Sequence, residues 1–378
     1  MNNRDLFRVF RGCLLLFVLP ASVAQAQYYP RPNEWERRNP SQLGFDAAKL
    51  QAAVDFAQAS ESATRTDLES LHAAIANEPF NSIIGPVKER GGVSGLVIRN
   101  GYIAAEWGDT RRVDMTFSAT KSYLSTVAGL AFDAGLLKST SDTVARDVAI
   151  EEFASSPHNA RITWHQLLNQ TSEWQGTLWE KPDWADRYNR QQGRRPVQEP
   201  GTAWTYNDVR VNVAALALLH VWREPLPRVL KTRIMDAIGA SHSWRWYGYD
   251  NSWVELDGLR MQSVSGGGHW GGGMQISAQD HARFGYLFLR GGKWNGRQLI
   301  SEQWIRQATT PTDVRRDYGY MWWLNAEKTH AAAPPSAFWA AGNGGNYIFV
   351  DTQHDLLIVL RWTRDFNGVI ERIYAALR

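Results

Sequence analysis

The chain has 378 residues, of which 44% are hydrophobic and 21% charged, and it carries 41 Lys and Arg against 38 Asp and Glu. This composition is that of a globular protein with one large domain or two interleaved domains, and it excludes a largely disordered chain. The charge is close to balanced, and after residue 26 it is 38 basic against 37 acidic residues (41 less three Arg, 38 less one Asp), which argues against a nucleic-acid partner. The single cysteine, Cys13, excludes an internal disulfide.

The first 26 residues differ from the rest of the chain. They combine an Arg-bearing start, a short apolar run over residues 13–20 and a small-x-small ending at Ala24 and Ala26. This order is typical of a secretory signal peptide, and the apolar run is too short to span a bilayer. We therefore expect an exported protein, periplasmic or secreted, without stable membrane insertion after cleavage. A retained amphipathic anchor is the alternative.

Three patterns predict regular structure in the next part of the chain. The apolar spacing after Asp46 predicts a capped helix over residues 46–59. Residues 92–108 alternate around Asn100-Gly101, the preferred pair for a tight turn, and predict two antiparallel strands. A second helix is expected after Ser118, with a stop at Gly135.

The remaining patterns predict the fold class. Helical patterns and Trp-rich loops dominate residues 138–290, with the clearest helices at 209–222 and 226–239, whereas 334–362 predict three strands and 367–378 a final helix. We therefore expect an α/β (α+β) protein with one antiparallel sheet from both termini, residues 27–137 and 291–378, flanked by helices. Residues 138–290 would form a mainly helical insert, and a ligand would bind in a cleft between the two.

Ser118 lies three residues before Lys121 at the start of the predicted helix. As an N-cap, Ser118 would accept a backbone N–H, although a capping box would need Glu or Gln where Lys121 stands. A cation there is opposed by the helix dipole, and a neutral amine on the same helix face could take a proton from the serine. Because one such spacing occurs by chance in about half of chains of this size, both interpretations stay open for this stretch alone.

Tyr206-Asn207-Asp208 follows a Pro-Gly-Thr turn just before a predicted helix. For Asn207 or Asp208 a helix cap is the favoured interpretation. Tyr206 is either a core tyrosine or a phenol held near Lys121, where it could pass a proton to or from the reacting groups.

Gly342, Gly344 and Gly345 stand at the entry to a predicted strand. Glycines there allow close approach of a ligand, and the strand edge could present an N–H to a developing oxyanion. A flexible turn is the simpler interpretation of this stretch in isolation.

Taken in this order, the three features resemble the serine hydrolases of the penicillin-binding protein and class C β-lactamase family. The similarity covers most of the chain after the signal, including "ITWHQLLNQTSEW" at 162–174 and residues 271–301, and it is greatest to 6-aminohexanoate-dimer hydrolases and related esterases. The resemblance implies a cofactor-free acyl-enzyme mechanism. Ser118 would attack a carbonyl, Lys121 would activate it and Tyr206 would assist proton transfer. The N–H groups of Ser118 and of Gly345 or its neighbour Gly344 would hold the oxyanion.

Two departures from the family's motifs bear on the substrate. Asp208 replaces the asparagine of Tyr-x-Asn, and its charge would favour Lys121 as a cation, against its role as base. Gly342-Asn343-Gly344 replaces Lys-Thr-Gly or His-Thr-Gly, so the group that holds a substrate carboxylate is missing. We therefore expect a small carboxylic ester or linear amide as substrate, with a β-lactamase or D,D-peptidase-like enzyme as the alternative.

Eighteen tryptophans is a high count. Most should lie in the core, but Trp174, Trp179 and Trp184 could form an aromatic acyl pocket. The same aromatics would suit a catalytically silent cell-wall or glycan-binding protein, the rival hypothesis, against which the intact serine, lysine and tyrosine set argues. His269 and Trp270 could border the cleft, although an ordinary loop is the simpler interpretation. The nine histidines show no metal-ligand spacing, so no metal is expected.

Overall fold

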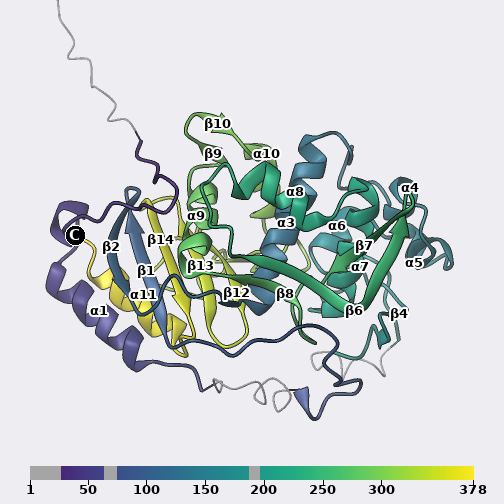
Figure 1. The fold of residues 1–378 in the computed structure, drawn as a ribbon, viewed down its shortest axis with the longest axis horizontal. Coiled ribbons are helices and arrows are strands. Elements are labelled where there is room, and N and C mark those ends of the chain that lie inside the picture. Colours follow the sequence, from purple (N-terminus) through teal and green to yellow (C-terminus); the bar gives the residue numbers. More distant parts are fainter. Residues whose placement is uncertain (1–26, 64–74, 187–195) are drawn as a thin grey trace, which may run out of the picture.

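The structure, a computed structural model of the chain, describes residues 27–63, 75–186 and 196–378. The expected signal peptide over residues 1–26 lies outside the described residues. A large antiparallel sheet lies on one side of the described structure, and most of the shorter helices lie on the other side (Figure 1).

The large sheet joins the two ends of the sequence, which confirms the expected fold class. Its strand order is β11-β12-β13-β14-β1-β2, and its pairings are antiparallel. The β1–β2 hairpin turns at Asn100 and Gly101, whose φ angles of 53° and 86° are the left-handed values that an Asn-Gly pair adopts readily. The strands are β1 (Ser94–Arg99), β2 (Tyr102–Trp107), β11 (Trp323–Leu324), β12 (Phe338–Gly342), β13 (Asn346–Asp351) and β14 (Leu356–Arg361).

β14 is a central strand with both faces buried. Leu357 and Val359 belong to the core shared with α9 (Ala278–Leu289), whereas Ile358 and Leu360 belong to the core shared with α1 (Ala47–Ala59) and α11 (Phe366–Ala375). A continuous apolar run is what a strand buried on both faces requires. The expected helices at both ends therefore cover one face of the sheet together, and α9 covers the other.

A second antiparallel sheet lies largely within residues 138–290, the range expected to form a mainly helical insert. Its order is β3-β8-β6-β7, with β3 (Asp114–Met115), β6 (Arg245–Leu256), β7 (Leu259–Val264) and β8 (Gly273–Ile276). β6 has no sustained apolar alternation because much of it is only partly buried, which removes the signal that predicts a strand. The predicted boundary at residue 290 also cuts α9 from the sheet on which it packs.

The other helices lie mainly beside these two sheets (Figure 1). They are α3 (Thr120–Asp133), α4 (Val144–Asp147), α5 (Glu151–Ala154), α6 (Trp164–Leu168), α7 (Asp208–Trp222), α8 (Leu226–Leu230) and α10 (Glu302–Ala308). Shorter elements are η1 (Pro40–Leu43), η2 (Phe117–Ala119), η3 (Asn159–Arg161), η5 (Lys231–Met235) and the hairpins β4–β5 (Thr177–Leu178, Lys181–Pro182) and β9–β10 (Lys293–Trp294, Arg297–Gln298). Within the described ranges, each helix is too short or too polar to cross a membrane.

α3 is buried on more than the one face that its sequence pattern predicts. Every residue from Thr120 to Ala131 is buried, because β12 packs on one side of the helix and α7 and α8 on others. The polar side chains in its first turn therefore meet α7 in the interior, and this contact forms the site described next.

Candidate active site

Ser118 does not cap α3. It lies in η2, the short turn before the helix; Ala119 is at the cap position, and no side chain makes a capping hydrogen bond there. Instead, the Ser118 hydroxyl oxygen accepts a hydrogen bond from Nζ of Lys121 at 2.9 Å. Ser118 is therefore not the N-cap that its position in the sequence suggested.

The turn that carries Ser118 is held on two sides. The N–H of Thr116 donates to the carbonyl of Met274 at 3.0 Å, and the N–H of Met274 donates to Oγ1 of Thr120 at 3.0 Å, which fixes the turn to β8. On the other side Gly342 lies so close that a β-carbon there would overlap the Thr116 carbonyl. Phe117, immediately before the serine, has a φ of 47°. Such strain in a non-glycine residue costs about 1–3 kcal/mol and is concentrated at functional sites.

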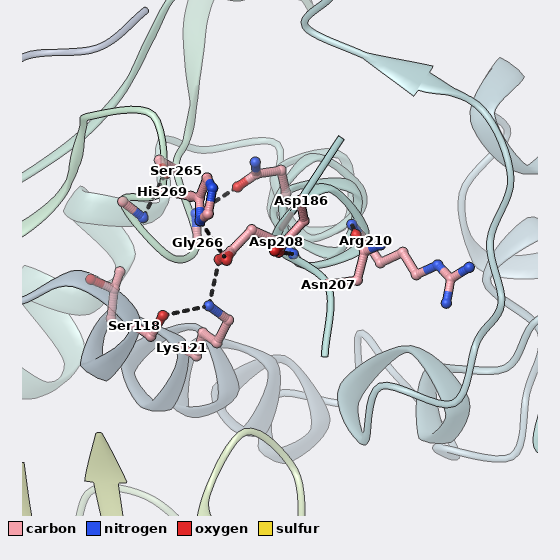
Figure 2. Close-up of polar contacts among 12 residues, drawn as sticks. Ser118, Lys121, Asp186, Asn207, Asp208, Arg210, Ser265, Gly266 and His269 are labelled. Carbon is pink, nitrogen blue, oxygen red and sulfur yellow. Dashed lines mark hydrogen bonds and ion pairs between the residues drawn. The ribbon is translucent and has the colours of Figure 1, made fainter. Parts of the chain in front are cut away.

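Lys121 connects Ser118 to α7. Its Nζ lies 2.5 Å from Oδ1 of Asp208, and the two side chains are 2% and 3% exposed. Figure 2 shows Lys121 in contact with Ser118 on one side and with Asp208 on the other. The ring of Tyr206 faces the same ammonium, with its centroid 4.6 Å from Nζ. The structure therefore brings Ser118, Lys121, Tyr206 and Asp208 together, although they come from two distant parts of the sequence.

The start of α7 explains why Asp208 faces the lysine. Asn207 is the N-cap, as the sequence suggested, and its side chain accepts a hydrogen bond from the N–H of Arg210 at 2.9 Å. Asp208 is the next residue, and its N–H donates to Oδ2 of the buried Asp186 at 3.0 Å. Because the Asp186 carboxylate and the Asn207 side-chain oxygen accept these N–H groups at the helix end, the Asp208 carboxylate is left to pair with Lys121.

His269 adds a second cation to Asp208. Its Nδ1 lies 3.3 Å from Oδ2 of Asp208, and its Nε2 lies 2.6 Å from Oε2 of the buried Glu78. Burial alone would lower the pKa of His269, but the hydrogen bonds to Asp208 and Glu78 outweigh it and raise the pKa to about 10. Burial alone would raise the pKa of Asp208, but the charges of Lys121 and His269 hold it below its ordinary value.

The loop that carries His269 passes directly over this ion pair. A β-carbon at Gly267 would overlap Oδ1 of Asp208 and would lie 2.5 Å from Nζ of Lys121. The loop is tied down by the Gly266 N–H, which donates to Oδ1 of Asn212 at 2.9 Å, and by the Gly268 N–H, which donates to Oγ of Ser265 at 2.9 Å. The glycine-rich stretch is therefore required by close packing over charged groups rather than by flexibility.

Asp186, Asp208 and His269 also place possible metal-ligand atoms within 4.8 Å of one another. Both nitrogens of His269 already face carboxylates, and the Asp208 carboxylate already faces Lys121 and His269. Charges that neutralise one another in this way indicate an ion-pair network, and a cation would have to displace Lys121 or the proton of His269.

A cavity of about 400 Å³ opens beside Ser118. An aromatic wall of Trp204, Tyr206 and Trp323 forms part of it, with the Tyr206 and Trp323 rings stacked at 6.0 Å and 24°. The lining residues are Ser118, Trp204, Tyr206, Arg315, Trp323, Ala341, Gly342 and Asn343. Arg315 is bound by both carboxylate oxygens of Asp317 and lies over the Trp204 ring, with its Cζ 4.1 Å from the centroid.

The cavity corrects the expected aromatic pocket. Trp174 is 1% exposed, its indole N–H donates to the Glu152 carbonyl at 2.7 Å, and it packs in the hydrophobic core rather than on the cavity. Trp184 contacts Phe80 instead, with ring centroids 5.3 Å apart. Trp204 and Trp323 were missed because a single sequence does not show which tryptophans the fold brings to Ser118.

The predicted oxyanion residues also differ in position. Gly344 and Gly345 lie in the turn between β12 and β13, where the Gly345 N–H donates to the Gly342 carbonyl at 3.3 Å. Gly342 and Asn343, by contrast, line the cavity with Ser118. The end of β12 is therefore the part of this motif that approaches the serine.

Residues 80–377 match the Beta-lactamase protein family. The chain belongs to the beta-lactamase family. This confirms the resemblance inferred from the sequence motifs and makes the protein a serine hydrolase of that family.

Solved structures of low sequence identity share the fold of this beta-lactamase family member. A family VIII carboxylesterase is 19% identical, with a TM-score of 0.57 over 88% of this chain and 99% of that chain. A Bacillus anthracis protein assigned as a 6-aminohexanoate-dimer hydrolase is 15% identical, with a TM-score of 0.57 over 92% of this chain and 88% of that chain.

A sequence relative, an uncharacterized protein of Alkalihalophilus pseudofirmus, is 21% identical to this chain over 351 residues, which are 79% of this chain and 92% of the relative.

Proposed function

We propose that this beta-lactamase family member is an exported hydrolase that cleaves a small carboxylic ester or linear amide through an acyl-enzyme on Ser118. The observation that carries the proposal is the 2.9 Å hydrogen bond between Lys121 Nζ and Ser118 Oγ, at the edge of a cavity large enough for a small substrate. Export rests on the signal-like first 26 residues.

In the proposed reaction, the Ser118 oxygen attacks the substrate carbonyl while its proton moves to the neutral amine of Lys121. The oxyanion accepts hydrogen bonds from the N–H of Ser118 and from a backbone N–H at the end of β12, for which Gly342 and Asn343 are better placed than Gly345. The proton then passes from Lys121 to the leaving oxygen or nitrogen with help from Tyr206. Water attacks the acyl-enzyme, and Ser118 recovers its proton.

The cavity favours an ester or linear amide over a β-lactam. Its wall is aromatic and suits an apolar acyl group. The guanidinium of Arg315, a cation among the lining residues, is already held by Asp317. The Gly342-Asn343-Gly344 stretch stands where related β-lactamases carry a cationic or hydroxyl-bearing motif, so it supplies no such group to bind a β-lactam carboxylate.

The test is hydrolysis of p-nitrophenyl acetate by the wild type and by Ser118→Ala. Ser125→Ala is the matched control, because Ser125 lies further along α3, is buried and has a hydroxyl without a hydrogen-bond partner in the described part of the chain. We expect Ser118→Ala to fall to background and Ser125→Ala to keep its activity. Equal activity of Ser118→Ala and the wild type would contradict the proposal.

The alternatives give different results in the same set of assays. A β-lactamase would turn over a chromogenic cephalosporin faster than the acetyl ester. A catalytically silent glycan-binding protein would retain cell-wall fragments and hydrolyse neither compound.

A further inference from the structure

The contact between Lys121 and Asp208 opposes the proposed reaction. A carboxylate 2.5 Å from Nζ favours the ammonium form of the lysine, whereas the base toward Ser118 must be the neutral amine. Related enzymes with an amide at this position do not face this problem. A chain with Asp208 therefore needs another group that weakens its hold on the lysine.

We infer that His269 is a positioning residue that shares the Asp208 carboxylate with Lys121 and thereby keeps Lys121 able to accept the Ser118 proton. The inference rests on the proposed function and extends it to His269 and its partner Glu78. Lys121 approaches Oδ1 of Asp208, whereas His269 approaches Oδ2, so the two cations divide one carboxylate between them.

Glu78 fixes the ring of His269 for this role. Its carboxylate lies 2.6 Å from Nε2, and its side chain is 1% exposed. Trp270 packs edge-on against the imidazole, with ring centroids 4.5 Å apart. Because both ring nitrogens face carboxylates, the doubly protonated imidazole is the form that satisfies every contact, and the row Lys121, Asp208, His269, Glu78 alternates in charge.

The other titratable groups around this row do not supply the same effect. Burial raises the pKa values of Tyr249 and Tyr318, so both phenols are neutral near Lys121 and Asp208. Asp186 accepts a hydrogen bond from the Asp208 N–H, and its negative charge favours the protonated form of His269. Lys181 Nζ lies over the Trp270 ring, 5.1 Å from its centroid, and donates to the Phe80 and Ser82 carbonyls. In the described part of the chain, the two cations in direct contact with Asp208 are therefore Lys121 and His269.

The role is electrostatic and leaves the proton balance of the reaction unchanged. The Ser118 proton goes to Lys121 as the bond between Oγ and the carbonyl carbon forms. It then passes to the leaving oxygen or nitrogen as the bond between that atom and the carbonyl carbon breaks. His269 keeps its own proton throughout. Removing its charge should consequently change the pH dependence of Ser118 activation rather than abolish the chemistry.

The experiment measures the rate at which a fluorophosphonate labels Ser118 as a function of pH, starting from about pH 5 and rising until the rate levels off. The variants are His269→Gln, Asp208→Asn and the double variant, and Ser118→Ala tests whether Ser118 is the labelled residue. His354→Gln is the matched control, because His354 lies 2.6 Å from Asp351 at the turn between β13 and β14 and does not contact the site.

We expect His269→Gln to move the acid limb upward by about 1 pH unit or more and to keep the rate at high pH. Asp208→Asn should move the limb downward, and in that background His269→Gln should have little further effect. A uniform loss at every pH, an unmoved limb, or the same shift in the Asp208→Asn background would overturn the inference. If Ser118→Ala is labelled like the wild type, the proposed function itself fails; if only the limb is unmoved, the proposed function stands.

A measurement on the wild type covers the case in which His269→Gln does not fold. The imidazole nitrogens of His269, observed by NMR, should both carry protons at about pH 8, above the ordinary titration of histidine. A neutral His269 at that pH would also overturn the inference.

Discussion

Lys121 and Asp208 form an ion pair that is almost completely removed from solvent, with Nζ 2.5 Å from Oδ1. Breaking such a pair from one side leaves a buried charge without its partner, which costs about 3–5 kcal/mol. The pair therefore has a structural consequence that can be separated from its place in catalysis.

Lys121→Met should lower kcat/KM for an acetyl ester by about 10²- to 10⁴-fold, because the proposed base is lost. It should also lower the free energy of unfolding, because the buried Asp208 carboxylate loses Lys121 and keeps His269 as its cationic partner. The double variant Lys121→Met with Asp208→Asn should regain stability in urea unfolding but not activity. Recovery of activity in the double variant would show that Lys121 is not the base.

Gly267→Ala should disable the site by steric overlap. A β-carbon there meets Asp208 and Lys121, so the loop or the ion pair must move, and a displacement of about 1 Å in a catalytic group can cost 10²-fold in rate. Gly92→Ala is the control, because a β-carbon at Gly92 has no atom within 4 Å. Esterase assays and thermal unfolding of both variants test this, and equal activity would contradict the described packing.

Trp204→Leu should change acyl-group preference. Trp204 lines the cavity beside Ser118, and loss of its aromatic surface should reduce kcat/KM for a benzoyl or long-chain ester about tenfold, with little effect on the acetyl ester. Trp253→Leu, at a tryptophan that is 43% exposed, should change neither. An equal loss for the acetyl ester would indicate damage to Tyr206 rather than a role in acyl binding.

The free energy of unfolding should fall at alkaline pH, because folding raises the pKa of His269. Its pKa is raised from 6.5 to about 10 in the folded protein, so its contribution is complete below pH 6.5 and is lost as the pH rises through about 10. Each unit of pKa difference corresponds to about 1.4 kcal/mol. The free energy of unfolding, measured in urea, should fall between these pH values in the wild type and fall less in His269→Gln. An equal slope in both proteins would refute this assignment.

Much of the fold could be predicted from local patterns. The helix after Asp46, the Asn100-Gly101 hairpin and the three C-terminal strands have strong periodicity or turn chemistry, and the structure confirms them. β6 escaped prediction because its burial is uneven along the strand. α3 was expected to bury one face, since its surroundings on the other faces are set by distant elements.

The sequence by itself determined the candidate chemistry, because Ser118, Lys121 and the Tyr206-Asn207-Asp208 motif are recognisable by residue type and local spacing. Only the tertiary structure decided which side chains meet them. His269 and Glu78 are 191 residues apart, and Trp204, Trp323 and Gly342 come from separate segments. Contacts between such distant residues depend on how sheets and helices pack, and neither periodicity nor spacing in one sequence encodes that packing directly.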